Sequence, residues 1–196
     1  MKHLFFGLLA TSGLLLTACN NNSEKKAENN EHSAHEKMDS TATNTNAAAS
    51  VQSADFTELF SHYQHLTVAL ASDDDKEAAN AAKGMLETLP KIKTEALTAE
   101  QKKNYGDIQA DIKENAEHIA ENVGNIDHQR EHLAVLSKDF YDIKKSIGTE
   151  EELYKVFCPM YDNKKGAFWL SKNKEVKNPY YGKKMLSCGT VQEELK

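Results

Sequence analysis

The part of the sequence that most limits the possible folds is the stretch 55–147, which contains one proline and repeats its apolar residues at helical spacing. Breaks at residues 72–75, at Pro90 and at Gly124-Asn125 divide it. Thr98-Ala-Glu-Gln101 fits a capping box, and Asn125 is suited to cap the next helix. Four helices joined by short breaks predict a mainly α domain, an antiparallel four-helix bundle followed by a small irregular or β-hairpin segment.

Residues 1–18 have the pattern of a secretory signal, with Lys2, a short apolar run and small residues before a cysteine. The run is too short and too interrupted for a membrane-spanning helix. Leu16-Thr17-Ala18-Cys19 resembles the lipobox of bacterial lipoproteins. The resemblance implies cleavage before Cys19, which would then be diacylglyceryl-modified and N-acylated and would anchor the chain to a membrane. An ordinary cleaved secretion signal is the alternative.

Residues 19–54 are predicted to form a disordered tether, because they are rich in Asn, Ser, Thr, Ala and charged residues and nearly lack large apolar ones. Within the tether, His32, His35 and Met38 could hold a copper or zinc ion loosely. Chance accumulation of histidine is favoured, because a disordered chain loses entropy when it chelates a metal. The predicted organisation is a lipoprotein signal peptide at 1–18, the lipidated tether at 19–54 and a helical domain at 55–196.

The charge balance excludes some partners. The formal net charge is −6, and it becomes −7 when Lys2, the only charged residue of the signal, is removed. An acidic domain is a poor binder of nucleic acid or of anionic lipid surfaces. No Ser/His/Asp set, paired acids or glycine-rich phosphate loop stands out, so we expect no catalytic residues and no enzyme.

The strongest chemical signal lies in residues 156–189, called the C-terminal segment below. Cys158 and Met160 stand at its start, and Met185 and Cys188 at its end. Two thiols and two thioethers are a soft donor set suited to Cu(I) or Ag(I). We therefore predict a metal site formed by Cys158, Met160, Met185 and Cys188.

A disulfide is the competing interpretation. If Cys19 carries lipid, Cys158 and Cys188 are an even pair, which in an oxidising compartment pairs by default. The bond would close a loop of about 30 residues and stabilise the domain by roughly 3–4 kcal/mol. A thiol oxidoreductase is a third class, disfavoured because no Cys-x-x-Cys is present. A redox-gated site that binds copper only when reduced combines the first two.

Local sequence patterns predict a hairpin and a turn around these residues. A β-hairpin is predicted from residues 154–158 and 167–170, joined by a turn at 162–166. Asn178-Pro179-Tyr-Tyr-Gly182 is typical of a turn that would bring Met185 and Cys188 back toward the first pair.

Other residues are expected to support the site. Trp169, with Tyr180 and Tyr181, would shield it from water. Arg130, the only arginine, would either bind a carboxylate of another element or extend to solvent. His128 and His132 are an i,i+4 pair that could bind a metal, but a solvated helix face is favoured.

Several motifs resemble those of a known family. They are Cys158-Pro-Met160, Gly166-Ala-Phe-Trp169-Leu-Ser, Asn178-Pro-Tyr-Tyr-Gly182, Met185-Leu-Ser-Cys188-Gly189 and the stretch 126–137. They are similar to an envelope domain of unknown function that occurs alone in lipoproteins or fused to CusB-like copper/silver efflux membrane-fusion proteins. The resemblance covers roughly 55–191 and implies a helical domain associated with heavy-metal handling. Tyr161 departs from the family, in which Ala is common after the Cys-Pro-Met motif.

These observations together predict a membrane-anchored lipoprotein of the cell envelope, facing the periplasm from the outer membrane. It would bind copper or silver ions as an accessory or chaperone to efflux, with efflux membrane-fusion proteins or other copper-handling proteins as partners. The alternative function is a non-catalytic structural or interaction lipoprotein with a Cys158–Cys188 disulfide.

Overall fold

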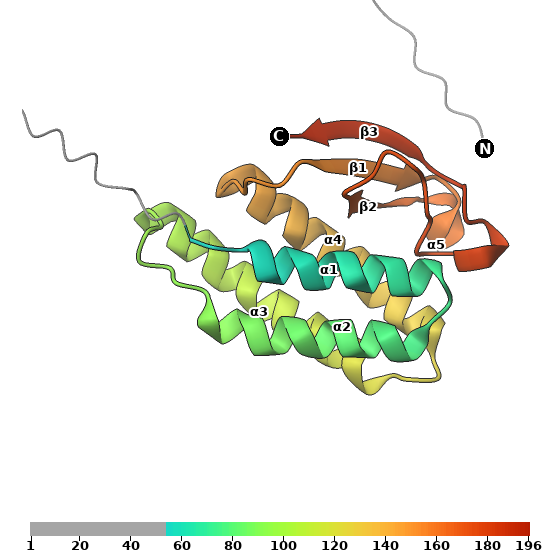
Figure 1. Ribbon diagram of the computed structural model, residues 1–196, viewed down its shortest axis with the longest axis horizontal. Helices are drawn as coiled ribbons and strands as arrows, with labels where there is room; N and C mark the ends of the chain where they lie inside the picture. The colour runs from blue at the N-terminus through green and yellow to red at the C-terminus, as the bar shows by residue number, and fades with distance from the viewer. Residues whose placement is uncertain (1–53) are drawn as a thin grey trace, which may run out of the picture. The chain divides into compact units, whose positions relative to one another are not determined.

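The computed structural model describes residues 54–196 (Figure 1). Its helices are α1 (Thr57–Ala71), α2 (Asp75–Thr88), the 3-10 turn η1 (Leu89–Lys91), α3 (Ala99–Glu121) and α4 (Ile126–Ser146). After them come β1 (Leu153–Cys158), the short α5 (Tyr161–Lys164), β2 (Ala167–Ser171), the 3-10 turn η2 (Gly182–Lys184) and β3 (Thr190–Leu195). The predicted signal, Cys19 and the tether residues His32, His35 and Met38 lie outside the described residues.

Side-chain caps begin three of the helices. The Asp74 carboxylate accepts a backbone N–H at the start of α2. Thr98 and Gln101 form the predicted capping box of α3. The Asn125 side chain accepts the His128 N–H at the start of α4 at 3.4 Å. Each cap satisfies a backbone donor that has no partner within its helix, and the predicted caps of α3 and α4 are confirmed.

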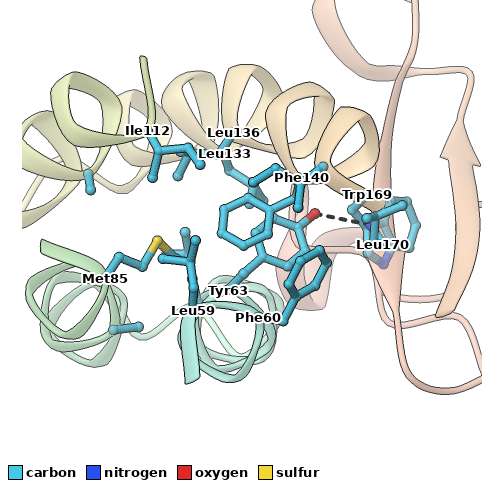
Figure 2. Packing of buried hydrophobic residues seen from close by; sticks show 14 of the residues in the cluster. Leu59, Phe60, Tyr63, Met85, Ile112, Leu133, Leu136, Phe140, Trp169 and Leu170 are labelled. Carbon is cyan, nitrogen blue, oxygen red and sulfur yellow. Dashed lines mark hydrogen bonds between the residues drawn. The ribbon is translucent and has the colours of Figure 1, made fainter. Parts of the chain in front are cut away.

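Consecutive helices pack against each other, α1 on α2, α2 on α3 and α3 on α4. Their apolar faces share one core, shown in Figure 2, with Leu59, Phe60, Tyr63, Met85, Ile112, Leu133, Leu136 and Phe140 buried. Val123 follows the end of α3 at Glu121 and is 49% exposed. The chain is mainly helical, and the bundle arrangement of the four helices stays a prediction. No helix within residues 54–196 is long and apolar enough to cross a membrane.

The predicted hairpin is confirmed and extended to a three-stranded antiparallel sheet in the order β2-β1-β3. Cys158 lies opposite Ala167 in the β1–β2 pair. The turn between these strands holds Asp162 and Asn163 at positive φ. β3 was not predicted from the sequence, because most of its side chains are exposed and it has no apolar alternation. Its pairing with β1 defines it as a strand.

Side chains of α1 form hydrogen bonds with backbone groups at the edge of β2 that faces away from β1. The Gln64 amide donates to the Leu170 carbonyl at 3.1 Å and accepts the Lys172 N–H at 3.2 Å. The Leu170 N–H donates to the Tyr63 hydroxyl oxygen at 3.0 Å (Figure 2). A helix thereby takes the place of a neighbouring strand, and the edge presents fewer unpaired groups to other chains.

The Tyr63 hydroxyl continues into a buried hydrogen-bonded chain. The Ser137 hydroxyl donates to the Leu133 carbonyl at 2.8 Å, so the Tyr63 hydroxyl donates to Ser137 Oγ, also at 2.8 Å. The hydrogen bonds therefore run from the Leu170 N–H through the Tyr63 and Ser137 hydroxyls to the Leu133 carbonyl. They join the sheet to α1 and α4, and every polar group of this buried series has a partner, because an unpaired polar group in the core would be costly.

Asp139 on α4 provides a test of this core. One of its carboxylate oxygens is buried without a hydrogen-bond partner in the described residues. Burial, and then the charges of Asp111 and Asp142, raises the pKa of Asp139 to about 7. The folded state therefore keeps a proton that the unfolded chain releases near pH 4, and the free energy of unfolding falls as pH rises from about 4 to 7.

We expect Asp139→Asn to stabilise the protein more at pH 8 than at pH 5, by about 2 to 3 kcal/mol, because Asn carries no charge at either pH. Urea unfolding at the two pH values measures this. Ser146→Ala replaces an exposed, uncharged residue of α4 and is the control; it should change the free energy of unfolding equally at the two pH values. An equal effect of Asp139→Asn at both pH values would contradict the raised pKa.

Candidate functional site

The two cysteines of the C-terminal segment lie in direct contact. Cys158 ends β1 and is buried, and Cys188 lies just before β3 and is half-buried. Their sulfur atoms are 3.3 Å apart, and both thiols are free. Pairing of Phe157 with Thr190 between β1 and β3 holds the two chain segments together beside the thiols. The strand framework therefore positions the pair without a covalent bond.

Asn178 fixes the approach of the chain to Cys188. Its buried side chain donates to the Cys188 carbonyl at 2.7 Å and accepts the Tyr180 N–H at 2.8 Å. Its own backbone N–H donates to the Leu186 carbonyl at 2.8 Å. One asparagine thus ties residues 186–188 to the start of the turn at 178–182. The sequence placed Asn178 in a turn, but the contact with residue 188 depends on the tertiary structure.

The methionines flank the thiol pair along the chain. Cys188 N–H donates to the Met185 carbonyl at 2.9 Å, which closes a turn between these residues. The Tyr181 hydroxyl donates to the Met160 carbonyl at 2.8 Å. Met160 is 40% exposed and Met185 is half-buried. The four predicted ligands all lie in the described part of the chain, and the two cysteines are in direct sulfur contact. Ligation by the methionines stays a prediction.

The surroundings of Cys188 favour its protonated thiol. Burial raises the pKa of Cys188, and the hydrogen bond and charge of Cys158 raise it further. Two thiolates side by side would repel each other, so a cation placed between them is the natural compensation. A metal bound here must displace protons, which makes its affinity dependent on pH.

Aromatic rings cover this part of the segment. Trp169 is buried in β2 and packs edge to face on Tyr180, with ring centroids 5.9 Å apart. Tyr180 also stacks on Tyr161 at 4.3 Å. A Cβ added to Gly189 would lie 2.9 Å from the Trp169 ring, so the residue after Cys188 passes directly against the tryptophan. The only tryptophan is therefore a natural optical reporter for events at Cys188.

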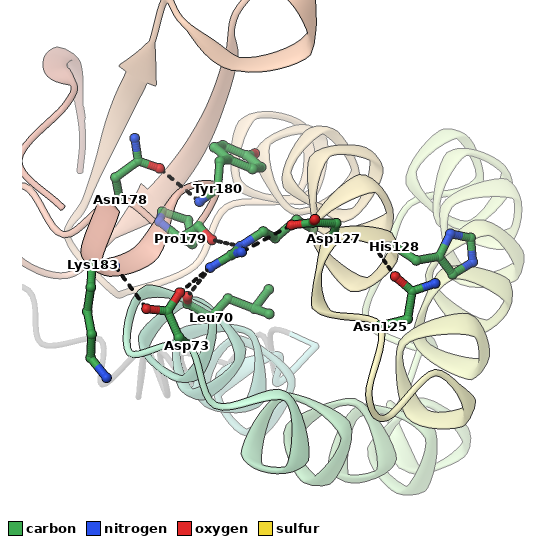
Figure 3. A network of polar contacts seen from close by, with 10 residues as sticks. Leu70, Asp73, Asn125, Asp127, His128, Asn178, Pro179, Tyr180 and Lys183 are labelled. Carbon is green, nitrogen blue, oxygen red and sulfur yellow. Dashed lines mark hydrogen bonds and ion pairs between the residues drawn. The ribbon is translucent and has the colours of Figure 1, made fainter. Parts of the chain in front are cut away.

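Arg130 joins this segment to the helices. Figure 3 shows its partners Leu70, Asp73, Asp127 and Pro179 lying close together. Arg130 is 5% exposed. Its Nε donates to the Pro179 carbonyl at 2.9 Å, and its Nη2 donates to the Leu70 carbonyl at 3.1 Å and to Asp73 Oδ1 at 2.6 Å. Its Nη1 donates to the exposed Asp127 carboxylate at 3.3 Å. The planar guanidinium is suited to several fixed acceptors at once.

Asp73 completes this connection from the turn between α1 and α2. Its second oxygen accepts the Lys183 N–H at 3.1 Å. Burial would raise the pKa of Asp73, but the hydrogen bonds from Arg130 and Lys183 outweigh it and lower the pKa. Gly182 lies against the ion pair, because a Cβ there would fall within 2 Å of Asp73 Oδ1. Gly182 and Pro179 therefore support the segment through the Arg130 contacts.

A cavity of about 740 Å³ lies beside the segment, and the sequence did not predict it. Its aromatic lining residues are Phe157, Tyr161, Phe168, Tyr180 and Tyr181, and its charged ones are Asp127, Arg130, Glu131, Lys138, Asp162 and Lys184. Neither cysteine is among its lining residues. Its mixture of aromatic and charged groups differs from the soft donors of the thiol pair, so we separate the cavity from the candidate metal site.

Comparison with known proteins gives one match. A family model described as "Protein of unknown function (DUF3347)" matches residues 59–152. This range covers most of the helical body, from within α1 to the residue before β1, and stops short of the C-terminal segment. No curated protein and no solved structure matches the chain significantly.

The close packing at Gly182 leads to a test by substitution. Gly182→Ala should destabilise the fold by about 2 kcal/mol or more, because φ is +53° and the new methyl would displace the Asp73–Arg130 pair. Gly106→Ala is the matched control, since Gly106 lies inside α3 with nothing within 4 Å of an added Cβ. The control should be stabilising by about 0.5–1 kcal/mol. Thermal or urea unfolding measures both, and equal stability of the two variants would contradict the packing at Gly182.

Proposed function

We propose that this protein binds a soft monovalent cation, Cu(I) or Ag(I), through Cys158 and Cys188, with Met160 and Met185 as additional donors. The observation that carries the proposal is the pair of free thiols 3.3 Å apart. Thiolates and thioethers prefer Cu(I) among the biological metals. The methionines distinguish this function from a plain disulfide, because a disulfide makes no use of thioether donors.

The surroundings of the pair suit a site that exchanges its ion. Cys158 is buried, Cys188 is half-buried and Met160 is largely at the surface. Donors of graded exposure allow an ion to move stepwise from a partner protein to the inner thiol. A transfer role needs such ligand exchange, whereas a closed structural site does not.

In this proposal the protein is a lipid-anchored accessory or chaperone of copper or silver efflux in the cell envelope. Cys19 would carry the anchor, the tether would extend the domain from the membrane, and an antiparallel four-helix bundle would support the C-terminal segment. Efflux membrane-fusion proteins or other copper-handling proteins would be its partners, and no catalysis is involved. The sequence resemblances described above support these assignments.

A second candidate is an interaction lipoprotein with a Cys158–Cys188 disulfide. The same sulfur contact favours it, because the two thiols need little movement to join. However, strand pairing, the Asn178 contacts and the Arg130 contacts already hold the segment. The fold therefore depends little on the bond, and oxidation of the pair would instead block metal binding.

Titration with Ag(I) tests the proposal. The full chain with Cys19→Ser, reduced and kept under nitrogen, should bind one Ag(I) per molecule and change the fluorescence of Trp169. Cys158→Ser and Cys188→Ser should each abolish this binding. Met160→Leu with Met185→Leu should weaken it roughly tenfold, since thioethers are weaker donors than thiolates.

Met85→Leu is the matched control, because Met85 is buried in α2 and Leu replaces Met in a core at small cost. Counting free thiols before reduction separates the two functions. If no thiol is free before reduction and the reduced protein binds Ag(I) no better than Cys158→Ser or Cys188→Ser, the metal function is wrong and the disulfide function stands. Binding equal to that of the Met160/Met185 double variant would show that the methionines are not ligands.

The protonated state of Cys188 gives a pH dependence. Because binding to the Cys188 thiolate releases its proton, the affinity for Ag(I) should rise with pH between 6 and 8, by about tenfold per unit for this one proton. Because the pKa of Cys188 is raised, its thiol is still protonated throughout this pH range in the absence of metal. Competition titrations at several pH values measure the slope, and a pH-independent affinity would show that thiolates are not the ligands.

A further inference from the structure

Three histidine rings meet where α3 and α4 join. His118 lies in the last turn of α3, and His128 and His132 lie in the first turns of α4. One ring nitrogen from each lies within 4.8 Å of the other two. His128 and His132 are half-buried, so the solvated face favoured from the sequence is not what the structure shows. His118, which is exposed, was not singled out from the sequence because its contact depends on the helix hairpin.

Hydrogen bonds orient the His132 ring. Its Nδ1 lies 2.8 Å from Asn115 Oδ1, and the Asn115 amide nitrogen donates to the Asp111 carbonyl at 2.8 Å. The second bond fixes which end of the amide is oxygen, so Nδ1 of His132 carries the hydrogen. The Nε2 of the neutral ring then presents a lone pair.

The His128 ring is oriented in the same way by an acid. Its Nδ1 lies 3.1 Å from the Glu131 carboxylate, which accepts the ring hydrogen. The Nε2 atoms of His128 and His132 face each other at 3.2 Å. In the neutral rings these are two lone pairs, which repel unless a cation or a proton lies with them. Imidazoles whose other nitrogen donates to a carboxylate or an amide are the usual arrangement of metal-ligating histidines.

The third ring completes the set. His118 is stacked on His132, with centroids 4.4 Å apart and planes at 5°, and lies edge-on to His128 at 5.9 Å. Within the described residues its side chain has no hydrogen bond, so its nitrogens can turn toward the pair.

From this geometry we propose that His118, His128 and His132 form a second metal site, for a borderline divalent cation such as Zn(II). Zn–N bonds of 2.0–2.1 Å at tetrahedral angles place two ligand nitrogens about 3.3 Å apart, close to the observed separation of the His128 and His132 Nε2 atoms. Three imidazoles leave a fourth position open to water. The donors contain no sulfur, so this site selects a different class of ion from the thiol pair.

The site joins the end of α3 to the start of α4. The connection between these helices is short, and Asn125 caps α4 beside His128. Glu131 and Glu114 add negative charge near His132, which favours a bound cation. The proposal stands apart from the Cu(I) or Ag(I) function, because its ligands and their supporting residues belong to the helices alone.

Zinc titration tests the site in a chain that lacks the thiols and the tether histidines. The background carries Cys19→Ser, Cys158→Ala, Cys188→Ala, His32→Gln and His35→Gln, and circular dichroism verifies its helical content. At pH 7.5 this chain should bind one Zn(II), measured by calorimetry. NMR of the histidine ring nitrogens should show shifts at three rings.

His132→Gln and His118→Ala should each remove this binding or weaken it at least tenfold. Asn115→Ala should weaken it roughly 10- to 100-fold while all three ligands remain, because Asn115 orients His132. His65→Gln is the matched control, since His65 is an exposed histidine on α1 paired with Glu77. It should bind Zn(II) as the background does.

Three results would overturn the proposal. The first is an unchanged affinity in His132→Gln, and the second is an equal loss in His65→Gln. The third is an absence of Zn(II) binding to the background chain at pH 7.5, and the NMR titration should then show one proton shared by His128 and His132. In that case the close approach of the two Nε2 atoms is an imidazole–imidazolium hydrogen bond.

Discussion

The contacts of the Arg130 guanidinium are the interaction on which the C-terminal segment most depends. A buried guanidinium must have acceptors, and here they come from two distant parts of the chain: Leu70 and Asp73 at the end of α1 and in the following turn, and the loop carbonyl of Pro179. Loss of one partner would leave a buried charge partly unpaired, which costs several kcal/mol. Gly182 follows from the same constraint, because no side chain fits between its Cα and the ion pair.

The second connection is between α1 and the edge of β2. Tyr63 and Gln64 supply the donors and acceptors that a fourth strand would otherwise provide. The Arg130 contacts and the edge of β2 thus both join the C-terminal part of the chain to the helices, and Cys158 and Cys188 approach each other within this framework. A pair positioned by non-covalent packing can remain reduced without loss of the fold. This property is what separates an exchangeable metal site from a structural disulfide.

The two proposed sites differ in donor chemistry and in location. The thiols and thioethers lie in the C-terminal segment, whereas the imidazoles lie on α3 and α4. Soft sulfur donors favour monovalent copper or silver, and imidazoles favour borderline divalent ions. Each set also has its own supporting residue, Asn178 for Cys188 and Asn115 for His132. One small domain would then hold two classes of ion without competition between the sites.

Helix positions, the Thr98–Gln101 capping box and the β1–β2 hairpin followed from the sequence, because periodicity, capping and turn preferences act between near neighbours in the chain. The soft donor set could likewise be read from the sequence. The strand β3, the contact of Asn178 with Cys188 and the meeting of His118 with His132 could not. These features arise when elements far apart in the chain pack together, since an exposed strand is defined by its partner and a ring cluster by the geometry of a helix hairpin. The sequence determined the elements and the available donors, and the tertiary structure decided which donors meet.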